Sequence, residues 1–198
     1  MSEKATYQTY CLADFRNTSG PIIDVRSPGE YSQGHLPGSI NLPLFSDNER
    51  DLIGKSYKKE GREKAIYLGL KITMPKIKSL SNSIQESVYR KENSTNSLRV
   101  YCWRGGMRSG TFGWLAASIG IKTYILSNGY KTYRKWVLKQ FEKDYPIRLL
   151  GGKTGTGKTD ILKSINNEEI HILDLEGLAN HRGSSFGSLG MKQQPTSQ

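Results

Sequence analysis

Apolar residues along the chain form short runs that alternate with segments of helical spacing. The runs at 20–25 and 98–102 each predict a buried strand that ends at polar or reactive side chains. Apolar positions recur at helical spacing over 109–119, residues 123–126 predict a further short strand, and 130–141 predict a basic, aromatic helix. Strands that alternate with helices favour an α/β fold around a parallel sheet, with functional side chains at the carboxyl ends of the strands.

The rest of the chain is less regular. The lysine-rich segment 45–91 predicts helical pieces joined by loops. A new unit is expected from Pro146, with a strand at 147–150, a glycine loop, a helix at 158–165 and a strand at 170–174. The expected division is therefore a first domain over 10–142, a partial second domain over 146–187, and a disordered tail of Gly, Ser, Gln and Pro over 188–198.

Charged side chains are distributed unevenly along the chain. The net charge is +11, yet residues 149–198 hold as many acidic as basic side chains. Residues 99–148 hold ten basic side chains against only Glu142 and Asp144. A cationic field of this kind suits an anionic substrate or a phosphate backbone, although solubility alone also explains a basic excess.

No apolar run approaches the length of about 20 residues that a membrane span needs. The N-terminus has no apolar stretch typical of a secretory signal, so a cytoplasmic location without membrane contact is expected. Cys11 and Cys102 are then expected to stay reduced.

Candidate chemistry centres on the loop that follows the strand at 98–102. Its reactive residue is Cys102, and a strand-end cysteine that leads into a helix places its sulfur over backbone N–H groups and a positive helix terminus. Such surroundings stabilise a thiolate, and a buried, inert core cysteine would not require the neighbouring glycines and arginines. The candidate active-site loop consists of Trp103, Arg104, Gly105, Gly106, Met107 and Arg108.

Two motifs in this order resemble the rhodanese family. The first runs through DVRSPGEY (24–31) and GHLPGSINLP (34–43), and the second is CWRGGMRS (102–109). The resemblance covers about 10–142 and implies a parallel five-stranded sheet with flanking helices, with Cys102 as the carrier of a chalcogen. His35 could be taken for a catalytic base, but in this family its motif is usually structural.

The five residues between Cys102 and Arg108 also match the C-x5-R loop of cysteine phosphatases, because sulfur transfer and phosphate hydrolysis share an anion cradle. The spacing therefore does not distinguish sulfur transferases from phosphatases. The residues within the loop do, and they resemble the loop of tRNA 2-selenouridine synthases more closely than that of phosphatases.

A second motif, GKTGTGKT over 152–159, fits the phosphate-binding P-loop pattern between a predicted strand and a predicted helix. Lys158 would neutralise a diphosphate, and Thr159 could ligate Mg²⁺ together with Asp174, although an acidic residue after a strand is common. No metal ligand is assigned with certainty. The candidate diphosphate-binding residues are Gly152, Gly155, Gly157, Lys158 and Thr159.

A rhodanese domain followed directly by a P-loop is the arrangement of the tRNA 2-selenouridine synthases, and residues 174–187 also resemble that family. The resemblance implies replacement of sulfur by selenium in wobble 2-thiouridine of tRNA. It implies selenophosphate and geranyl diphosphate as co-substrates, an S-geranylated intermediate, and a diphosphate held by the P-loop.

Family members continue far beyond Gly187, whereas this chain ends soon after it. Two strands and one helix cannot bury both faces of a P-loop sheet. We therefore expect a C-terminally truncated product, or a fragment completed by a separate polypeptide. Two other functions remain open from the sequence: a stand-alone rhodanese sulfurtransferase or C-x5-R phosphatase, and an inactive remnant that binds tRNA.

Overall fold

The computed structural model of the chain describes residues 7–89, 96–153, 155–166 and 169–196. Residues 90–91, Thr154 and residues 197–198, which belong to the expected helical segment, P-loop and tail, lie outside this range. The chain divides into two compact units, Met1–Phe141 and Glu142–Gln198.

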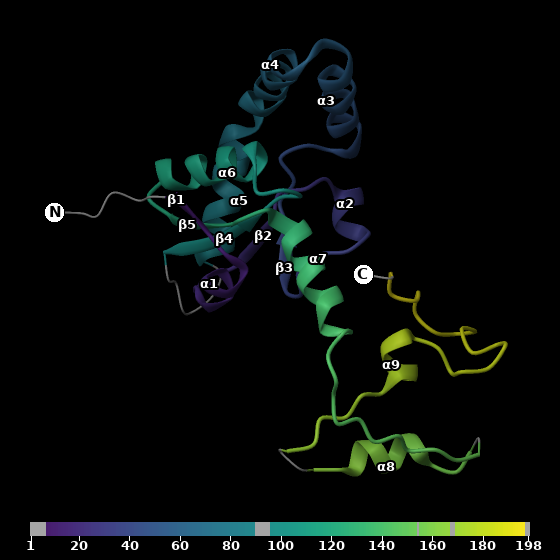
Figure 1. Cartoon of the computed structure of the whole chain (residues 1–198). Coiled ribbons are helices and arrows are strands. Elements are labelled where there is room, and N and C mark those ends of the chain that lie inside the picture. The colour runs from purple at the N-terminus through teal and green to yellow at the C-terminus, as the bar shows by residue number, and fades with distance from the viewer. Residues whose placement is uncertain (1–6, 90–95, 154, 167–168, 197–198) are drawn as a thin grey trace. The chain divides into compact units, whose positions relative to one another are not determined.

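The first unit is a parallel five-stranded sheet between two layers of helices, which confirms the expected fold class (Figure 1). The strand order is β1-β5-β4-β2-β3, and every pairing is parallel. Register is set by pairs such as Ile23 with Val100 and Val100 with Ile125. The strands are β1 (Tyr7–Tyr10), β2 (Ile22–Asp24), β3 (Ser39–Asn41), β4 (Ser97–Tyr101) and β5 (Lys122–Leu126).

Apolar residues alternate between the two faces of the sheet and thereby define two cores. Val100 and Ile23 pack with residues of α5 and α6 on one face, whereas Tyr101 and Leu126 pack with α1 and α7 on the other. The helices of the first unit are α1 (Leu12–Asn17), α2 (Pro28–Ser32), α3 (Asp47–Glu60), α4 (Arg62–Thr73), η1 (Met74–Lys76), α5 (Ile77–Tyr89), α6 (Met107–Ser118) and α7 (Gly129–Gln140).

Local sequence explains several helix starts. Ser27 with Glu30 forms a capping box at α2, and Ser46 with Glu49 forms another at α3, so backbone donors at both helix starts are satisfied. The helices expected over 109–119 and 130–141 are confirmed as α6 and α7, and the expected helical pieces of 45–91 as α3, α4, η1 and α5.

The second unit contains α8 (Lys158–Ser164) and α9 (Leu175–Ala179). The expected helix at 158–165 is confirmed, but the expected strands at 147–150 and 170–174 are wrong, because both segments are irregular. Their apolar side chains remain exposed, Leu149 at 89% and Leu173 at 61%. An apolar run becomes a strand only where a neighbouring strand pairs with its backbone, and the described residues of this unit supply none.

Within the part of the chain that the structure describes, no helix combines the length and the apolar character needed to cross a bilayer.

Candidate functional site

Cys102 lies directly after β4, an interior strand of the sheet that is hydrogen-bonded to β2 and β5. The residue is only 3% exposed. Parallel strands bring their carboxyl ends to one edge of the sheet, so the end of β2 lies beside this position, and the Val25 amide donates to the Tyr101 carbonyl at 3.1 Å. The cysteine is therefore fixed by the most constrained part of the sheet.

The loop after Cys102 is held by the start of α7. The amide of Tyr130 donates to the Cys102 carbonyl at 2.8 Å, and the amide of Lys131 donates to the Trp103 carbonyl at 3.2 Å. A Cβ on Gly129 would lie 2.0 Å from the Cys102 carbonyl oxygen, and a Cβ on Gly105, whose φ is +63°, would lie 2.6 Å from that of Leu126. Both glycines are thus required for the close approach of the two segments.

Ser109, in the first turn of α6, contacts the cysteine. Its Oγ lies 3.3 Å from Cys102 Sγ and 3.0 Å from the Gly106 carbonyl oxygen, and the residue is fully buried. A thiol can donate to this hydroxyl, whereas an anionic sulfur can only accept from it, so Ser109 can serve either state. Ser109 belongs to the quoted motif but was assigned no role from the sequence, and only its position in the first turn of the helix that follows the loop could have indicated one.

The arginines of the loop have different surroundings. Arg104 is exposed, as are Trp103 and Met107. Arg108 instead forms an ion pair with Glu30, with Nη1 to Oε2 at 2.6 Å. The positive charge expected beside the sulfur is therefore compensated by a carboxylate at this position. Burial by itself raises the pKa of Glu30, but the hydrogen bond and charge of Arg108 outweigh it and lower the pKa below its usual value.

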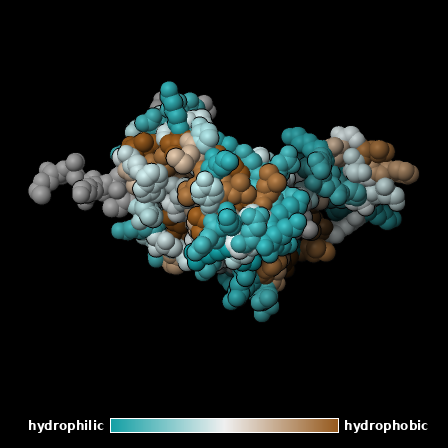
Figure 2. Space-filling view, turned by 90° about the horizontal axis from the view of Figure 1, so that it is seen from above, coloured by the Kyte–Doolittle hydropathy of each residue, from teal (hydrophilic) through white to brown (hydrophobic). Residues whose placement is uncertain are grey.

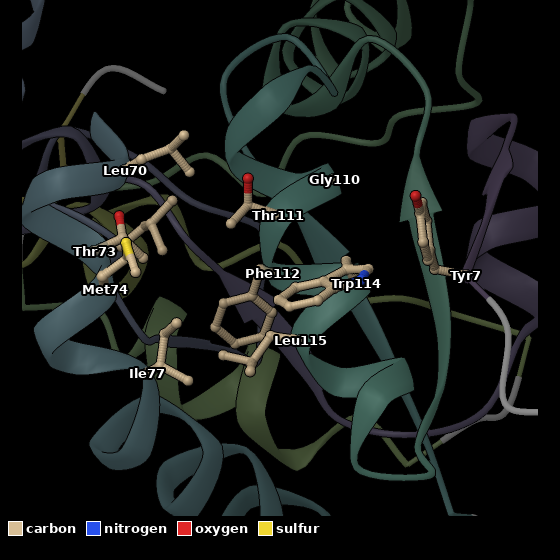
Figure 3. A pocket seen from close by; sticks show the side chains of 11 residues that line it. Tyr7, Leu70, Thr73, Met74, Ile77, Gly110, Thr111, Phe112, Trp114 and Leu115 are labelled. Carbon is tan, nitrogen blue, oxygen red and sulfur yellow. The ribbon is translucent and has the colours of Figure 1, made fainter. Parts of the chain in front are cut away.

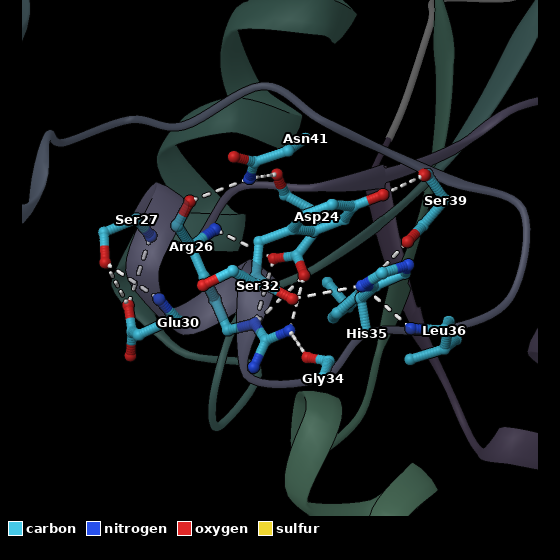
Figure 4. A network of polar contacts seen from close by, with 12 residues as sticks. Asp24, Arg26, Ser27, Glu30, Ser32, Gly34, His35, Leu36, Ser39 and Asn41 are labelled. Atoms are coloured by element: carbon cyan, nitrogen blue, oxygen red, sulfur yellow. Dashed lines mark hydrogen bonds and ion pairs between the residues drawn. The ribbon is translucent and has the colours of Figure 1, made fainter. Parts of the chain in front are cut away.

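A second ion pair is completely buried at the end of β2 (Figure 4). Both side chains of the pair, Asp24 and Arg26, have no exposed surface, and Arg26 Nη2 lies 2.6 Å from Asp24 Oδ2 and 2.6 Å from the Gly34 carbonyl oxygen. Burial alone would lower the pKa of Arg26, but its hydrogen bond to Asp24 and the charge of that carboxylate raise it. The Arg26 guanidinium also lies 4.0 Å from the Tyr130 ring centroid and 5.8 Å from that of Trp103.

This pair was not predicted from the sequence as part of the site. The sequence does contain a pattern that indicates it: two opposite charges, two residues apart, directly after an apolar strand suggest a buried pair at the end of the strand. Tyr101 joins the same network, since its hydroxyl accepts from the Leu36 amide at 3.1 Å and lies 3.1 Å from Ser39 Oγ. Burial, and secondarily the charge of Asp24, raises the pKa of Tyr101.

His35 has the surroundings of a structural residue. Its ring stacks on Tyr31 with centroids 3.9 Å apart, and its Nδ1 lies 3.0 Å from the Tyr31 carbonyl oxygen. Both contacts tie the turn after α2 to that helix.

An apolar pocket of about 370 Å³ lies beside α6. Figure 2 shows apolar side chains among the polar surface of the molecule, and Figure 3 shows the pocket itself. Among the described residues, no carboxylate, histidine, lysine, arginine or thiol lines it, so it offers space mainly for an apolar group. The lining residues are Tyr7, Leu44, Leu70, Thr73, Met74, Ile77, Gly110, Thr111, Phe112, Trp114 and Leu115.

The glycine loop of the second unit curls around Lys158. Gly155 and Gly157 have φ values of +82° and +75°, and Lys158 Nζ donates to the carbonyls of Gly152 at 2.9 Å and Lys153 at 2.8 Å. The ammonium thus lies inside the loop, where it would meet a bound phosphate. Thr159 follows it in the first turn of α8.

Asp174 is not at the end of a strand. Its carboxylate accepts from the Gly177 amide at 3.0 Å and caps α9. Over the described residues there is no group of three or more His, Cys, Asp or Glu side chains that could hold a metal ion. Whether Thr159 and Asp174 share a Mg²⁺ ion therefore stays a prediction.

The first unit thus has a cysteine at the end of an interior parallel strand, in a glycine-rich loop that leads into a helix. Residues 9–135 match the rhodanese-like domain family, and the chain belongs to that family. Residues 145–198 match the tRNA 2-selenouridine synthase AAA domain.

Curated relatives extend this result. The chain is 40% identical over 191 residues to a tRNA 2-selenouridine synthase from Sulfurovum sp. (strain NBC37-1), a match that covers 93% of this chain and 50% of the relative. It is 41% identical over 170 residues to a protein of the same name from Psychromonas ingrahamii, covering 84% and 44%. The chain thus spans about half the length of the curated relatives it matches.

A solved structure shows the same fold for the first unit. It is the N-terminal domain of a putative ATP/GTP binding protein from Clostridium difficile 630, 35% identical, with a TM-score of 0.61. The match covers 66% of this chain and 99% of that domain.

Proposed function

We propose that this chain contributes to the replacement of sulfur by selenium in 2-thiouridine at the wobble position of tRNA. Selenophosphate would be the selenium donor, and an S-geranylated uridine formed with geranyl diphosphate would be the intermediate. The observation that carries the proposal is the buried Cys102 Sγ, 3.3 Å from the Ser109 hydroxyl at the end of an interior strand. The names of the relatives at about 40% identity support the same substrate class.

In this proposal each part of the site has a separate task. Cys102 is the proposed chalcogen carrier, loaded by a donor that transfers a zero-valent chalcogen to its thiolate and leaves as the donor's own thiolate, and Ser109 donates a hydrogen bond when the sulfur or its attached chalcogen is anionic. The amides of Gly155 and Gly157 would receive a diphosphate, with Lys158 released from the Gly152 carbonyl to neutralise it. Thr159 is the candidate Mg²⁺ ligand beside it.

The experiment that tests this function supplies the chain with tRNA containing 2-thiouridine, geranyl diphosphate and selenophosphate. Mass spectrometry of the digested nucleosides should detect 2-selenouridine or its S-geranylated precursor. The control is the Sulfurovum relative at full length. If the control forms both products and this chain forms neither, in the presence or absence of a separately expressed C-terminal half of that relative, the proposed function is wrong.

A stand-alone sulfurtransferase is a second candidate, because the first unit has a five-stranded sheet with a core on each face. Turnover of thiosulfate by the chain without tRNA would support it. The phosphatase alternative has less support, because the ion pair of Arg108 with Glu30 occupies the guanidinium that would bind a phosphate.

We expect the basic face of α7 to bind the tRNA backbone. Alanine at Lys131, Arg134, Lys135 and Lys139 should weaken binding and make its salt dependence shallower, by roughly 0.7 to 0.9 in slope for each phosphate that is no longer neutralised. Filter binding at several salt concentrations measures this. Alanine at four exposed lysines of α3 and α4 is the matched control, namely Lys55, Lys58, Lys59 and Lys64. Equal salt-dependence slopes in the α7 variant and the wild type would show that this face does not contact the tRNA backbone.

We also expect the second unit to bind diphosphates weakly in this chain. Among the described residues no strand of this unit supports its loop, so binding must first order the loop, at a cost of about 1 to 2 kcal/mol for each residue fixed. Amide hydrogen exchange should be slow in β4 and fast over 147–150 and 170–174. Calorimetry should detect little binding of geranyl diphosphate, and tight binding that Lys158→Ala abolishes would contradict this expectation.

A further inference from the structure

Trp103 is an exposed aromatic side chain next to a buried nucleophile. It follows Cys102 directly in the chain, yet it is 36% exposed whereas Cys102 is 3% exposed. A tryptophan ring carries a large apolar surface that usually contributes to a core or to an interface. Here part of that surface faces solvent at the edge of the sheet that holds the reactive cysteine.

The ring is held in place from behind. Its centroid lies 5.6 Å from that of Tyr130, with the planes tilted by 36°, and the Arg26 guanidinium lies 5.8 Å from it. Tyr130 is 3% exposed and Arg26 is fully buried in its ion pair with Asp24, so both supports are fixed by their own packing. The Lys131 amide fixes the backbone through the Trp103 carbonyl. A ring that is already ordered loses little entropy when a planar ligand stacks on it.

The charges around the ring suit a nucleotide. Arg104 and Lys131 are exposed, and Lys131 is tied to Trp103 through the backbone. The sequence from Arg99 to Phe141 contains no acidic residue. Proteins that bind single-stranded RNA combine a positive surface for the phosphates with aromatic rings on which bases stack.

Further along α7 the aromatic rings are already covered. Tyr133 and Trp136 continue the series at centroid distances of 6.2 and 6.0 Å, but both pack against the core formed with α1. The Arg16 guanidinium lies 4.6 Å from the Trp136 ring. These rings therefore support the one exposed ring of Trp103 and are not themselves available for stacking on further bases.

We propose that Trp103 stacks on a single pyrimidine base, the 2-thiouridine whose sulfur is exchanged. The inference rests on the proposed function, and it assigns to this ring the task of holding the unpaired base next to Cys102. Trp103 is in this sense a substrate-binding residue, and the chalcogen chemistry remains at Cys102.

The test uses the full chain and an anticodon stem-loop RNA with 2-thiouridine at the wobble position, or with an abasic site there. Trp103→Ala should weaken binding of the thiouridine RNA by about 10- to 100-fold, the scale for loss of one stacked base. Trp103→Phe should restore most of the affinity. Trp114→Ala, at an exposed tryptophan of α6 outside the loop, is the matched control. The abasic RNA should bind the wild type as weakly as it binds Trp103→Ala, because neither complex contains a base stacked on the Trp103 ring.

Tryptophan fluorescence provides a second measurement that does not depend on affinity. RNA binding should quench the wild type and Trp114→Phe, and this quenching should be lost in Trp103→Phe. If Trp103→Ala weakens binding of thiouridine and abasic RNA equally, the stacking inference is wrong while the proposed function stands. If the wild type forms 2-selenouridine but shows no quenching, the inference also fails. If neither binding nor product is observed, both proposals fail.

Discussion

Replacement of Cys102 by serine should reduce transfer of sulfur or selenium by about a thousandfold or more, the scale seen when a covalent nucleophile is removed. The serine side chain is nearly isosteric, so the contact with Ser109 at 3.3 Å and the fold should persist. A hydroxyl oxygen cannot form the persulfide or selenosulfide bond that carries the chalcogen. Mass spectrometry of the intact protein, after exposure to a persulfide donor, should show the added chalcogen on the wild type and none at position 102 of the variant.

Cys11 provides the matched control within the same chain. It is exposed and caps α1, where its sulfur accepts from the Asp14 amide at 3.5 Å. Serine is a good capping residue, so Cys11→Ser should keep both the helix and the transfer activity. Transfer that survives in Cys102→Ser but not in Cys11→Ser would show that the wrong cysteine has been assigned.

Replacement of Asp24 by asparagine should destabilise the first unit by about 3 to 5 kcal/mol, because it leaves the buried charge of Arg26 uncompensated. Urea unfolding monitored by circular dichroism measures the change in free energy of unfolding. A second variant that combines Asp24→Asn with Arg26→Met should recover part of the loss, since it removes both charges.

Asp51→Asn is the control for this experiment. Asp51 pairs with Lys55, but both side chains are largely exposed, at 57% and 65%, so no measurable destabilisation is expected. If Asp24→Asn is as stable as Asp51→Asn, loss of the Asp24 charge does not leave a costly uncompensated charge on Arg26, and the prediction is wrong.

The interior of the sheet is easier to predict from the sequence than its edges. β2 and β4 are apolar runs that end at functional loops, and their type and place are confirmed. β1 and β3, at the two edges of the sheet, received no such prediction, since Tyr7–Tyr10 and Ser39–Asn41 carry little apolar pattern. Short edge strands depend on pairing with a neighbour more than on their own residues.

The candidate site shows a similar division. The glycines and the cysteine form a local motif, so their loop could be predicted from the residues of that segment alone. The pairing of Arg108 with Glu30 could not, because it joins residues that are far apart in sequence and depends on the approach of α2 to α6. The apolar segments 147–150 and 170–174 illustrate the opposite error: their composition suits a strand, but composition does not show whether a partner strand lies beside them.

The strand order also determines when the reactive centre can form as the chain folds. β4 must pair with β2 from the early part of the unit and with β5 from its late part, and β1 pairs with β5 across nearly the whole unit. Pairing between such distant segments requires the closure of long loops before the strands stabilise one another. The cysteine loop is held by β4 on one side and by the start of α7 on the other. Because β4 also pairs with β2, the complete surroundings of Cys102 form only when the first and last thirds of the unit have met.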